Sequence, residues 1–236
     1  AELVEKYVDI DRLLELTKQV APAALPMSVS HRTYRREPSF TVAIARDPAF
    51  NFMYEANIRY LHHLGEVTYF SPLADTSLPD AGFVYLPGGY PELYLAALSA
   101  NRPMLQSIRR YVENGGKLLA ECGGMMYLCD EIRDKNGDVF PMVGVLHQSA
   151  TMENMKLRLG YRTLLYNDAR LKGHEFHYSR LVEQQDPLPS CAVAYTAKGV
   201  ETDTPLYHYK NVWAGYTHLY WADPAGNDWF TKFIIK

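Results

Sequence analysis

Apolar residues in the middle of the chain follow two spacings, one typical of buried strands and one typical of helices. The predicted elements of this part are strands over residues 40–45, 66–71, 81–86 and 117–122 and helices over 50–64, up to Leu98 and over 103–113. Strands that alternate with helices at this spacing indicate a parallel sheet. The pattern therefore predicts an α/β fold, a three-layer sheet of mainly parallel strands with helices on both faces.

The pattern changes after about residue 140, where β-prone runs follow one another with few helical signals. The predicted strands of this half cover residues 142–152, 157–166, 191–196, 205–209 and 212–219. Such runs indicate antiparallel strands that extend the sheet or return along its edge. A helix over residues 223–233, capped near Asn227 or Asp228, is expected to close the chain.

The first 39 residues differ from the rest. Residues 1–20 place apolar side chains at near-helical spacing, whereas residues 21–39 carry Pro22, Pro26 and Pro38 and are typical of an extended linker. We therefore expect one unit over residues 1–39 and a main domain over residues 40–236.

Composition narrows the function classes. The 236 residues carry a net charge of −3, which gives no electrostatic case for binding nucleic acid or an anionic membrane. We expect no membrane span and no signal peptide, because no apolar run approaches the required length. The three cysteines, Cys122, Cys129 and Cys191, have no metal-site spacing. An odd and sparse cysteine count fits a reduced, cytoplasmic compartment.

The most informative stretch surrounds Cys122. A short apolar run leads to this cysteine, and Gly123, Gly124 and an apolar helical pattern follow it. A strand that turns sharply into a helix presents a nucleophile at the turn, and the helix N-terminus favours the thiolate. A buried structural cysteine is the alternative interpretation.

A nucleophilic cysteine needs oxyanion donors and a base. Gly88, Gly89 and Tyr90 follow a neighbouring strand, so this loop and Cys122 should face the same crevice at the carboxyl ends of the strands. A backbone N–H of this loop and that of Gly123 are the candidate oxyanion donors. As a structural alternative, the glycines mark only a tight turn.

Two regions offer the histidine base. His218 ends a β-prone run and could project into the crevice, while His174 and His177 compete with it. Glu175 lies between the latter two, a spacing that also suggests metal binding. No third ligand accompanies them at a sensible spacing, so we expect no metal.

Four motifs together resemble a known family. They are Leu86–Glu92 (LPGGYPE), Ala120–Leu128 (AECGGMMYL), Gly173–Ser179 (GHEFHYS) and Gly215–Tyr220 (GYTHLY). In this order they resemble the glutamine amidotransferase domain of cobyrinate a,c-diamide synthases, a branch of the triad-type, class I-like glutaminases with a flavodoxin-like fold. Residues 1–20 resemble the end of the ATP-binding synthetase domain that precedes this domain in such enzymes.

The resemblance implies a role for Cys122, a role for His218 and a separate step in the synthetase domain. Cys122 would attack the side-chain amide of glutamine, and His218 would act as the base. The ammonia released would serve ATP-dependent amidation of the a and c carboxylates of cobyrinate in cobalamin biosynthesis. The family implies no cofactor in this domain, whereas ATP and Mg²⁺ are expected in the synthetase domain. The fragment alone is expected to be slow or inactive, and a homodimer is left open.

The sequence departs from many triad glutaminases at Tyr220, where these enzymes carry an acid that orients the histidine. The cobyrinate branch commonly lacks that acid too. Glu175 and His174 are candidates for an orienting or interface role, and Glu121 is a structural or interface candidate. Two further hypotheses compete: the same chemistry serving another tetrapyrrole such as nickel sirohydrochlorin, and a cysteine hydrolase or non-catalytic interaction domain of the same fold.

Overall fold

The structure is a computed structural model that describes residues 2–19, 40–183 and 188–232. Its contacts divide the chain into residues 1–34 and residues 35–236, and each unit is described by itself. The first unit contains α1 (Glu2–Tyr7) and α2 (Ile10–Gln19). The segment is broken at Asp9, whose Oδ1 accepts a hydrogen bond from Arg12 N (2.9 Å) and caps α2. The predicted linker over residues 21–39 lies outside the described residues.

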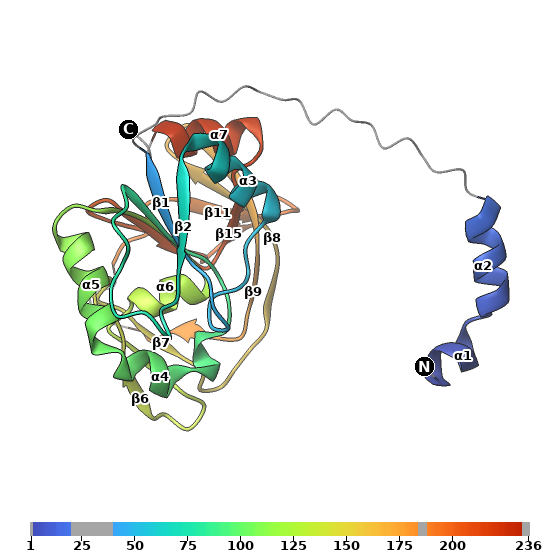
Figure 1. The fold of residues 1–236 in the computed structure, drawn as a ribbon, viewed down its shortest axis with the longest axis horizontal. Coiled ribbons are helices and arrows are strands. Elements are labelled where there is room, and N and C mark those ends of the chain that lie inside the picture. Colours follow the sequence, from blue (N-terminus) through green and yellow to red (C-terminus); the bar gives the residue numbers. More distant parts are fainter. Residues whose placement is uncertain (1, 20–39, 184–187, 233–236) are drawn as a thin grey trace. The chain divides into compact units, whose positions relative to one another are not determined.

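A six-stranded sheet forms the centre of the second unit (Figure 1), in the order β13-β14-β4-β3-β1-β2. Its strands are β1 (Thr41–Ala45), β2 (Glu66–Phe70), β3 (Phe83–Leu86), β4 (Lys117–Glu121), β13 (Leu206–Tyr209) and β14 (Val212–Gly215). All pairings are parallel except that of the edge strand β13 with β14. The α/β prediction with mainly parallel strands is confirmed.

Helices cover both faces of this sheet. The helical segments are α3 (Glu55–Leu64), the 3₁₀ turn η1 (Pro91–Leu93), α4 (Leu95–Ala100), α5 (Arg102–Glu113), α6 (Gly123–Leu128) and α7 (Pro224–Phe230). Ala43 and Leu118, on one face of the sheet, share a buried cluster with residues of α4, α5 and α6. On the other face Phe83 packs edge-on against Phe230 of α7, which in turn packs against Tyr60 of α3. Buried side chains therefore line both faces of the central strands, as a parallel sheet requires.

Two smaller sheets contain the rest of the chain. A five-stranded antiparallel sheet joins β8 (Arg158–Tyr166), β9 (Ala169–His177), β11 (Val193–Thr196), β12 (Glu201–Thr202) and β15 (His218–Tyr220). A four-stranded sheet joins β5 (Glu131–Arg133), β6 (Val139–Pro141), β7 (Ser149–Thr151) and β10 (Arg180–Leu181). The prediction of an antiparallel extension or edge is confirmed for β13, the antiparallel edge strand of the central sheet, whereas β8 and β11 lie in a separate antiparallel sheet.

Several predicted boundaries are wrong. The helix predicted over 50–64 begins only at Glu55, because Phe52 is extended and bridges to Gly88. The strand predicted over 212–219 is two strands in different sheets, and most of residues 142–152 form no strand. Both positions of the predicted cap, 227 and 228, lie within α7 and not at its start.

The last helix is capped by Asp223, whose Oδ1 accepts a hydrogen bond from Gly226 N (2.7 Å). Across the described ranges, no helix has the length and apolar character to cross a membrane.

Candidate active site

Cys122 occupies a sharp turn between β4 and α6. Its backbone has a φ of 48°, in the left-handed region that a residue with a side chain rarely adopts. The turn is held by hydrogen bonds from Cys122 N to Gly215 O (2.7 Å) and from Met126 N to Cys122 O (3.0 Å). Gly124 lets α6 approach β3, because a Cβ there would lie 2.2 Å from Leu86 O. The structure thus has the strand-turn-helix order that the sequence predicts.

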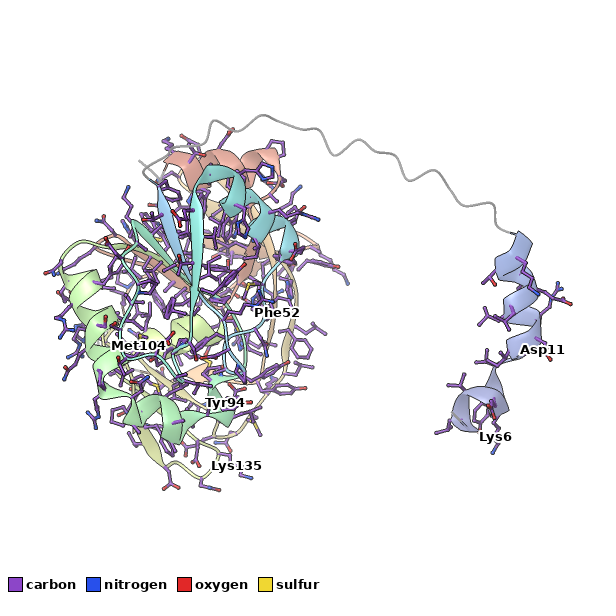
Figure 2. All side chains as sticks on the ribbon, viewed as in Figure 1. Lys6, Asp11, Phe52, Tyr94, Met104 and Lys135 are labelled. Carbon is purple, nitrogen blue, oxygen red and sulfur yellow. The ribbon has the colours of Figure 1, made fainter. Side chains whose placement is uncertain are left out.

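Cys122 and His218 line the same cavity. Its volume is about 220 Å³, and the residues that line it are Phe52, Gly89, Tyr90, Cys122, His174, Phe176 and His218. Figure 2 labels Phe52, which comes from the extended segment before α3. The cavity brings together the predicted nucleophile, the predicted base and the glycine loop, although these come from separate parts of the chain.

The glycine loop offers one unused backbone donor. Gly88 N donates to Phe52 O (3.1 Å) and Tyr90 N donates to Ala49 O (3.0 Å). In the part of the chain that the structure describes, no hydrogen bond uses Gly89 N. A Cβ added to Gly123 would lie 3.2 Å from that nitrogen, so the two glycines are neighbours. Of the loop residues expected to donate to an oxyanion, Gly89 is the one whose N–H is unused, and it lies next to Gly123.

His218 is buried at the wall of this cavity. It lies opposite His174 in the β15–β9 pairing, and the two rings stack with centroids 4.9 Å apart. Phe52 packs edge-on against the same ring at 4.5 Å. Gly88 leaves the space the ring needs, because a Cβ there would lie 2.1 Å from His218 Cε1. The ring is thus fixed by packing on several sides.

Burial sets the protonation states of the two reactive groups. It lowers the pKa of His218 to about 3, with His174 and His177 acting in the same direction. It raises the pKa of the Cys122 thiol to about 12, and the Glu92 carboxylate adds to the effect, so the expectation that the helix N-terminus favours the thiolate is wrong. At neutral pH the pair is a neutral imidazole beside a neutral thiol. His218 can therefore accept a proton, and Cys122 has one to give.

Glu121 connects β4, which precedes Cys122, to β15, which contains His218. Its buried Oε1 accepts hydrogen bonds from Leu219 N (3.1 Å) and Trp221 Nε1 (3.4 Å), and its Oε2 accepts one from Tyr85 OH (2.6 Å). Burial raises the pKa of Glu121 to about 7, against the effect of these hydrogen bonds. Since Glu121 precedes Cys122 and Leu219 follows His218, this carboxyl group ties the two reactive residues together through the backbone.

The side chain of Asn57 also forms hydrogen bonds with the backbone of β15 and of the residue after it. This buried side chain of α3 donates from Nδ2 to Leu219 O (2.8 Å) and accepts from Trp221 N at Oδ1 (3.1 Å). Asn57 was not predicted as a site residue, since an asparagine at a helical position has no local signal of such a role. Tyr54 was missed for the same reason, and its hydroxyl lies 2.6 Å from His174 Nδ1.

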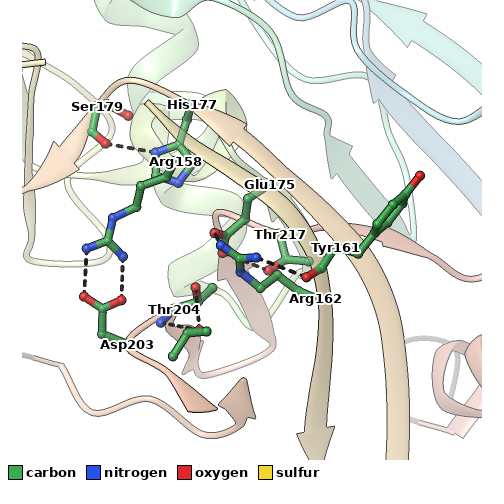
Figure 3. Close-up of polar contacts among 10 residues, drawn as sticks. Arg158, Tyr161, Arg162, Glu175, His177, Ser179, Asp203, Thr204 and Thr217 are labelled. Carbon is green, nitrogen blue, oxygen red and sulfur yellow. Dashed lines mark hydrogen bonds and ion pairs between the residues drawn. The ribbon is translucent and has the colours of Figure 1, made fainter. Parts of the chain in front are cut away.

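Glu175 lies close to Arg162 and Thr217 (Figure 3). Neighbouring residues of a strand point to opposite faces, so Glu175 and His174 lie on different faces of β9. Glu175 Oε2 lies 2.9 Å from Arg162 Nη2, and Thr217 Oγ1 donates to Glu175 Oε1 at 3.4 Å. Among the described residues His218 Nδ1 has no hydrogen-bond partner. An orienting role for Glu175 stays a prediction, and His174 is the candidate that contacts the His218 ring.

His177, the other histidine of this motif, is directed toward a second cavity. This cavity of about 310 Å³ is lined by Glu175, His177, Ser179, Tyr216 and others, and its rim includes Arg158, which forms two hydrogen bonds with Asp203. The His177 ring stacks on Tyr216 with centroids 3.8 Å apart, and its Nδ1 lies 2.9 Å from Ser179 O. Within the described ranges, no group of three or more His, Cys, Asp or Glu side chains could hold a metal ion.

Comparisons with known proteins agree with the motifs. Residues 41–226 match the model of the CobB/CobQ-like glutamine amidotransferase domain. The chain is 36% identical to the hydrogenobyrinate a,c-diamide synthase of Stutzerimonas stutzeri over 93% of this chain and 52% of that protein. It is 35% identical to the cobyrinate a,c-diamide synthase of Clostridium acetobutylicum over 100% of this chain and 53% of that protein. The chain thus spans about half the length of the curated relatives it matches.

Solved structures agree on the fold. PurLQS from Thermotoga maritima has a TM-score of 0.53 at 18% identity, over 76% of this chain and 87% of that one. A glutamine amidotransferase has a TM-score of 0.54 at 16% identity, over 83% of this chain and 99% of that one. At such low identity these likenesses concern the fold alone. The family match, which spans most of the second unit, goes further: the chain belongs to the family of CobB/CobQ-like glutamine amidotransferase domains.

Proposed function

We propose that this chain is the glutamine-hydrolysing part of a cobyrinate or hydrogenobyrinate a,c-diamide synthase, with Cys122 as nucleophile and His218 as base. The observation that carries the proposal is that Cys122, on a strained turn, shares one cavity with a neutral histidine and an unused backbone N–H of Gly89. Family membership and the names of the relatives support the reaction class.

The first half of the reaction forms a thioester. Cys122 Sγ attacks the side-chain amide carbon of glutamine while its proton moves to the neutral His218 ring. The N–H groups of Gly89 and Gly123 stabilise the oxyanion of the tetrahedral intermediate. When the carbon–nitrogen bond breaks, His218 returns the proton to the leaving nitrogen, and ammonia departs.

The second half restores the thiol. Water attacks the thioester carbon and gives a proton to His218, the carbon–sulfur bond breaks, and the proton returns to Cys122 as glutamate leaves. Because burial disfavours a free thiolate at Cys122, the proton transfer to His218 accompanies the attack instead of preceding it. The close packing around His218 keeps its ring in place through both proton transfers.

The ammonia would be used elsewhere in the full-length enzyme. The relatives named as a,c-diamide synthases are about twice as long as this chain. We place ATP, Mg²⁺ and the tetrapyrrole with the half that lies outside it. On this proposal ammonia amidates the a and c carboxylates of the macrocycle.

Replacing Cys122 in the full-length enzyme tests the proposal. Cys122→Ser should lower glutamine-dependent amidation by about 1,000-fold or more, since nucleophile and base act as a unit. Amidation driven by added ammonium should stay at the wild-type rate. The half-buried Cys191 supplies the control, and Cys191→Ser should leave both reactions unchanged. Glutamine-dependent amidation that survives Cys122→Ser would overturn the proposal, and loss of both reactions would assign Cys122 to the fold.

A further inference from the structure

The ring of His174 lies against the ring of His218. The two residues face each other directly in the pairing of β9 with β15, and their rings are stacked with an angle of 19° between the ring planes. Side chains in directly paired positions share a face of a sheet. His174 also lines the cavity that contains Cys122. A second histidine therefore lies beside the proposed base, within the same cavity.

Other side chains hold the His174 ring in this position. The Tyr54 hydroxyl lies 2.6 Å from His174 Nδ1, and Phe52 packs edge-on against the ring with centroids 5.4 Å apart. The Tyr54 ring packs edge-on against Tyr220, also at 5.4 Å. Burial raises the pKa of Tyr54 to about 12, so its hydroxyl keeps its proton and brings no charge to the histidine pair. The His174 ring is therefore fixed by contacts other than the one with His218.

The surroundings of His174 favour its neutral form. Burial lowers the pKa of His174 below its ordinary value, although the Glu175 carboxylate on the other face of β9 acts in the opposite direction. The charged residue of β9 on the same face as His174 is Lys172, which is exposed. The titratable side chains that face His174 from neighbouring elements are Tyr54, Cys122, Tyr161, His218 and Tyr220. His174 is therefore neutral at pH 7 and takes up a proton in acid.

A charge on His174 would oppose the proposed proton transfer. His218 becomes an imidazolium when it takes the proton of Cys122, and like charges repel strongly at short distance where water is excluded. The centroids of the two rings are only 4.9 Å apart. After burial, His174 is the next cause of the lowered pKa of His218. The base can therefore accept a proton only while the neighbouring ring is neutral.

We propose that His174 is a positioning residue for the base: its neutral ring holds the His218 ring in place, and its protonation in acid stops glutamine hydrolysis. The inference rests on the proposed function, because it takes His218 as the base. The sequence has tyrosine at position 220, where many triad glutaminases carry the acid that orients the histidine. A stacked ring orients His218 without adding a charge, and it makes the base respond to the pH.

The test compares His174→Phe with His174→Ala in the full-length enzyme, by glutamate release at pH 8. Phenylalanine keeps a flat ring beside His218, so His174→Phe should hold kcat within about threefold of wild type. Alanine removes the ring, and kcat should fall by roughly 10- to 100-fold because the base is no longer held in position. KM for glutamine should change by less than about threefold in both variants, since His174 acts through the base.

The pH profile separates this role from a purely structural one. The kcat of the wild type should fall several-fold from pH 8 to pH 5 as His174 takes up a proton. His174→Phe should lose much less of its kcat over this range, because its ring cannot be protonated and His218 itself has a pKa of about 3. His62→Phe is the matched control, because His62 is an exposed histidine of α3, and this variant should keep the wild-type profile.

Three results overturn the inference. They are a wild-type kcat at pH 8 in His174→Ala, a kcat of His174→Phe as low as that of His174→Ala, and a His174→Phe profile as steep as that of the wild type. Amidation driven by added ammonium shows whether each variant is folded, and His174→Tyr supplies a second flat ring without a basic nitrogen if His174→Phe is not. Each result is read in enzyme whose glutamine hydrolysis is abolished by Cys122→Ser, so the failure of this inference is distinct from the failure of the proposed function.

Discussion

Single atoms decide the geometry of the cavity. Any side chain at position 88 would clash with His218, because a Cβ added to Gly88 would lie 2.1 Å from His218 Cε1 and 2.9 Å from its Nδ1. The same residue is tied to Phe52 by a backbone hydrogen bond in each direction, at 2.9 and 3.1 Å. If a larger residue replaced Gly88, the loop could not move away from His218 without breaking these two hydrogen bonds.

Gly88→Ala should therefore act on catalysis. We expect kcat for glutamine hydrolysis in the full-length enzyme to fall by about 100-fold, because displacing a catalytic group by about 1 Å has an effect of this size. Gly82→Ala is the control, since a Cβ at Gly82 would meet Thr41 O at an ordinary 3.6 Å. A Gly88→Ala enzyme with normal kcat would show that the base need not occupy the position seen here.

The proposed oxyanion donor shows which features of single residues can be predicted from the sequence and which cannot. The order of residues around Cys122 is local, so a strand, a sharp turn and a helix are predictable from it. The choice of Gly89 over Gly88 or Tyr90 depends on which N–H groups are already used by Phe52 and Ala49, about 40 residues earlier in the chain. No local pattern contains that information.

At the scale of elements, the short strand β15 contains His218, the proposed base. This strand is three residues long and pairs with β9. The side chains of Asn57 and Glu121 also form hydrogen bonds with its backbone and with the residue that follows it. Asn57 binds Leu219 O and Trp221 N, and Glu121 binds Leu219 N. A strand this short has few ladder hydrogen bonds, so these side chains determine its position.

Asn57→Ala should destabilise the fold by about 2–3 kcal/mol, because it leaves a buried carbonyl and a buried N–H without partners. Chemical unfolding of the chain in urea measures the change. Asn51→Ala removes an asparagine that is exposed and makes one long hydrogen bond, to Pro48 O at 3.3 Å. This control should stay within about 0.5 kcal/mol of wild type. Equal effects of the two substitutions would contradict the role of Asn57.

Two elements could not be read correctly from the sequence. The β-prone run over residues 212–219 looks like one strand, yet β14 and β15 belong to different sheets. Strand β9 was not predicted, because beyond Leu171 its buried face contains Gly173, Glu175 and His177, which are not apolar side chains. Tertiary contacts, the Arg162–Glu175 ion pair among them, compensate for that polar face.

At the scale of the whole molecule, two buried groups give opposite pH dependences to stability. His218 has a pKa of about 3 in the fold, against about 6.5 when unfolded, so protons favour the unfolded chain as pH falls below 6.5. Glu121 has a pKa of about 7 in the fold, against about 4.5 when unfolded. Its contribution to stability is present at low pH and is lost as pH rises toward 7.

His218→Asn should isolate the first effect. The wild-type chain should lose about 2 kcal/mol of unfolding free energy through His218 between pH 8 and pH 5, and the variant should not. Urea unfolding of both proteins at the two pH values gives this difference, and groups common to both proteins cancel. Parallel curves for the two proteins would mean that His218 keeps its ordinary pKa in the fold.

The position of Cys122 and His218 in different sheets has a consequence for the distance between them. Cys122 follows a strand of the parallel sheet, His218 belongs to the antiparallel sheet, and only Tyr216 and Thr217 connect β14 to β15. The separation of thiol and imidazole therefore depends on the contacts that hold the two sheets together, among them the hydrogen bond from Leu219 N to the buried Glu121 carboxyl group. A substitution that shifts one sheet against the other would change the distance between Cys122 and His218 without touching either residue.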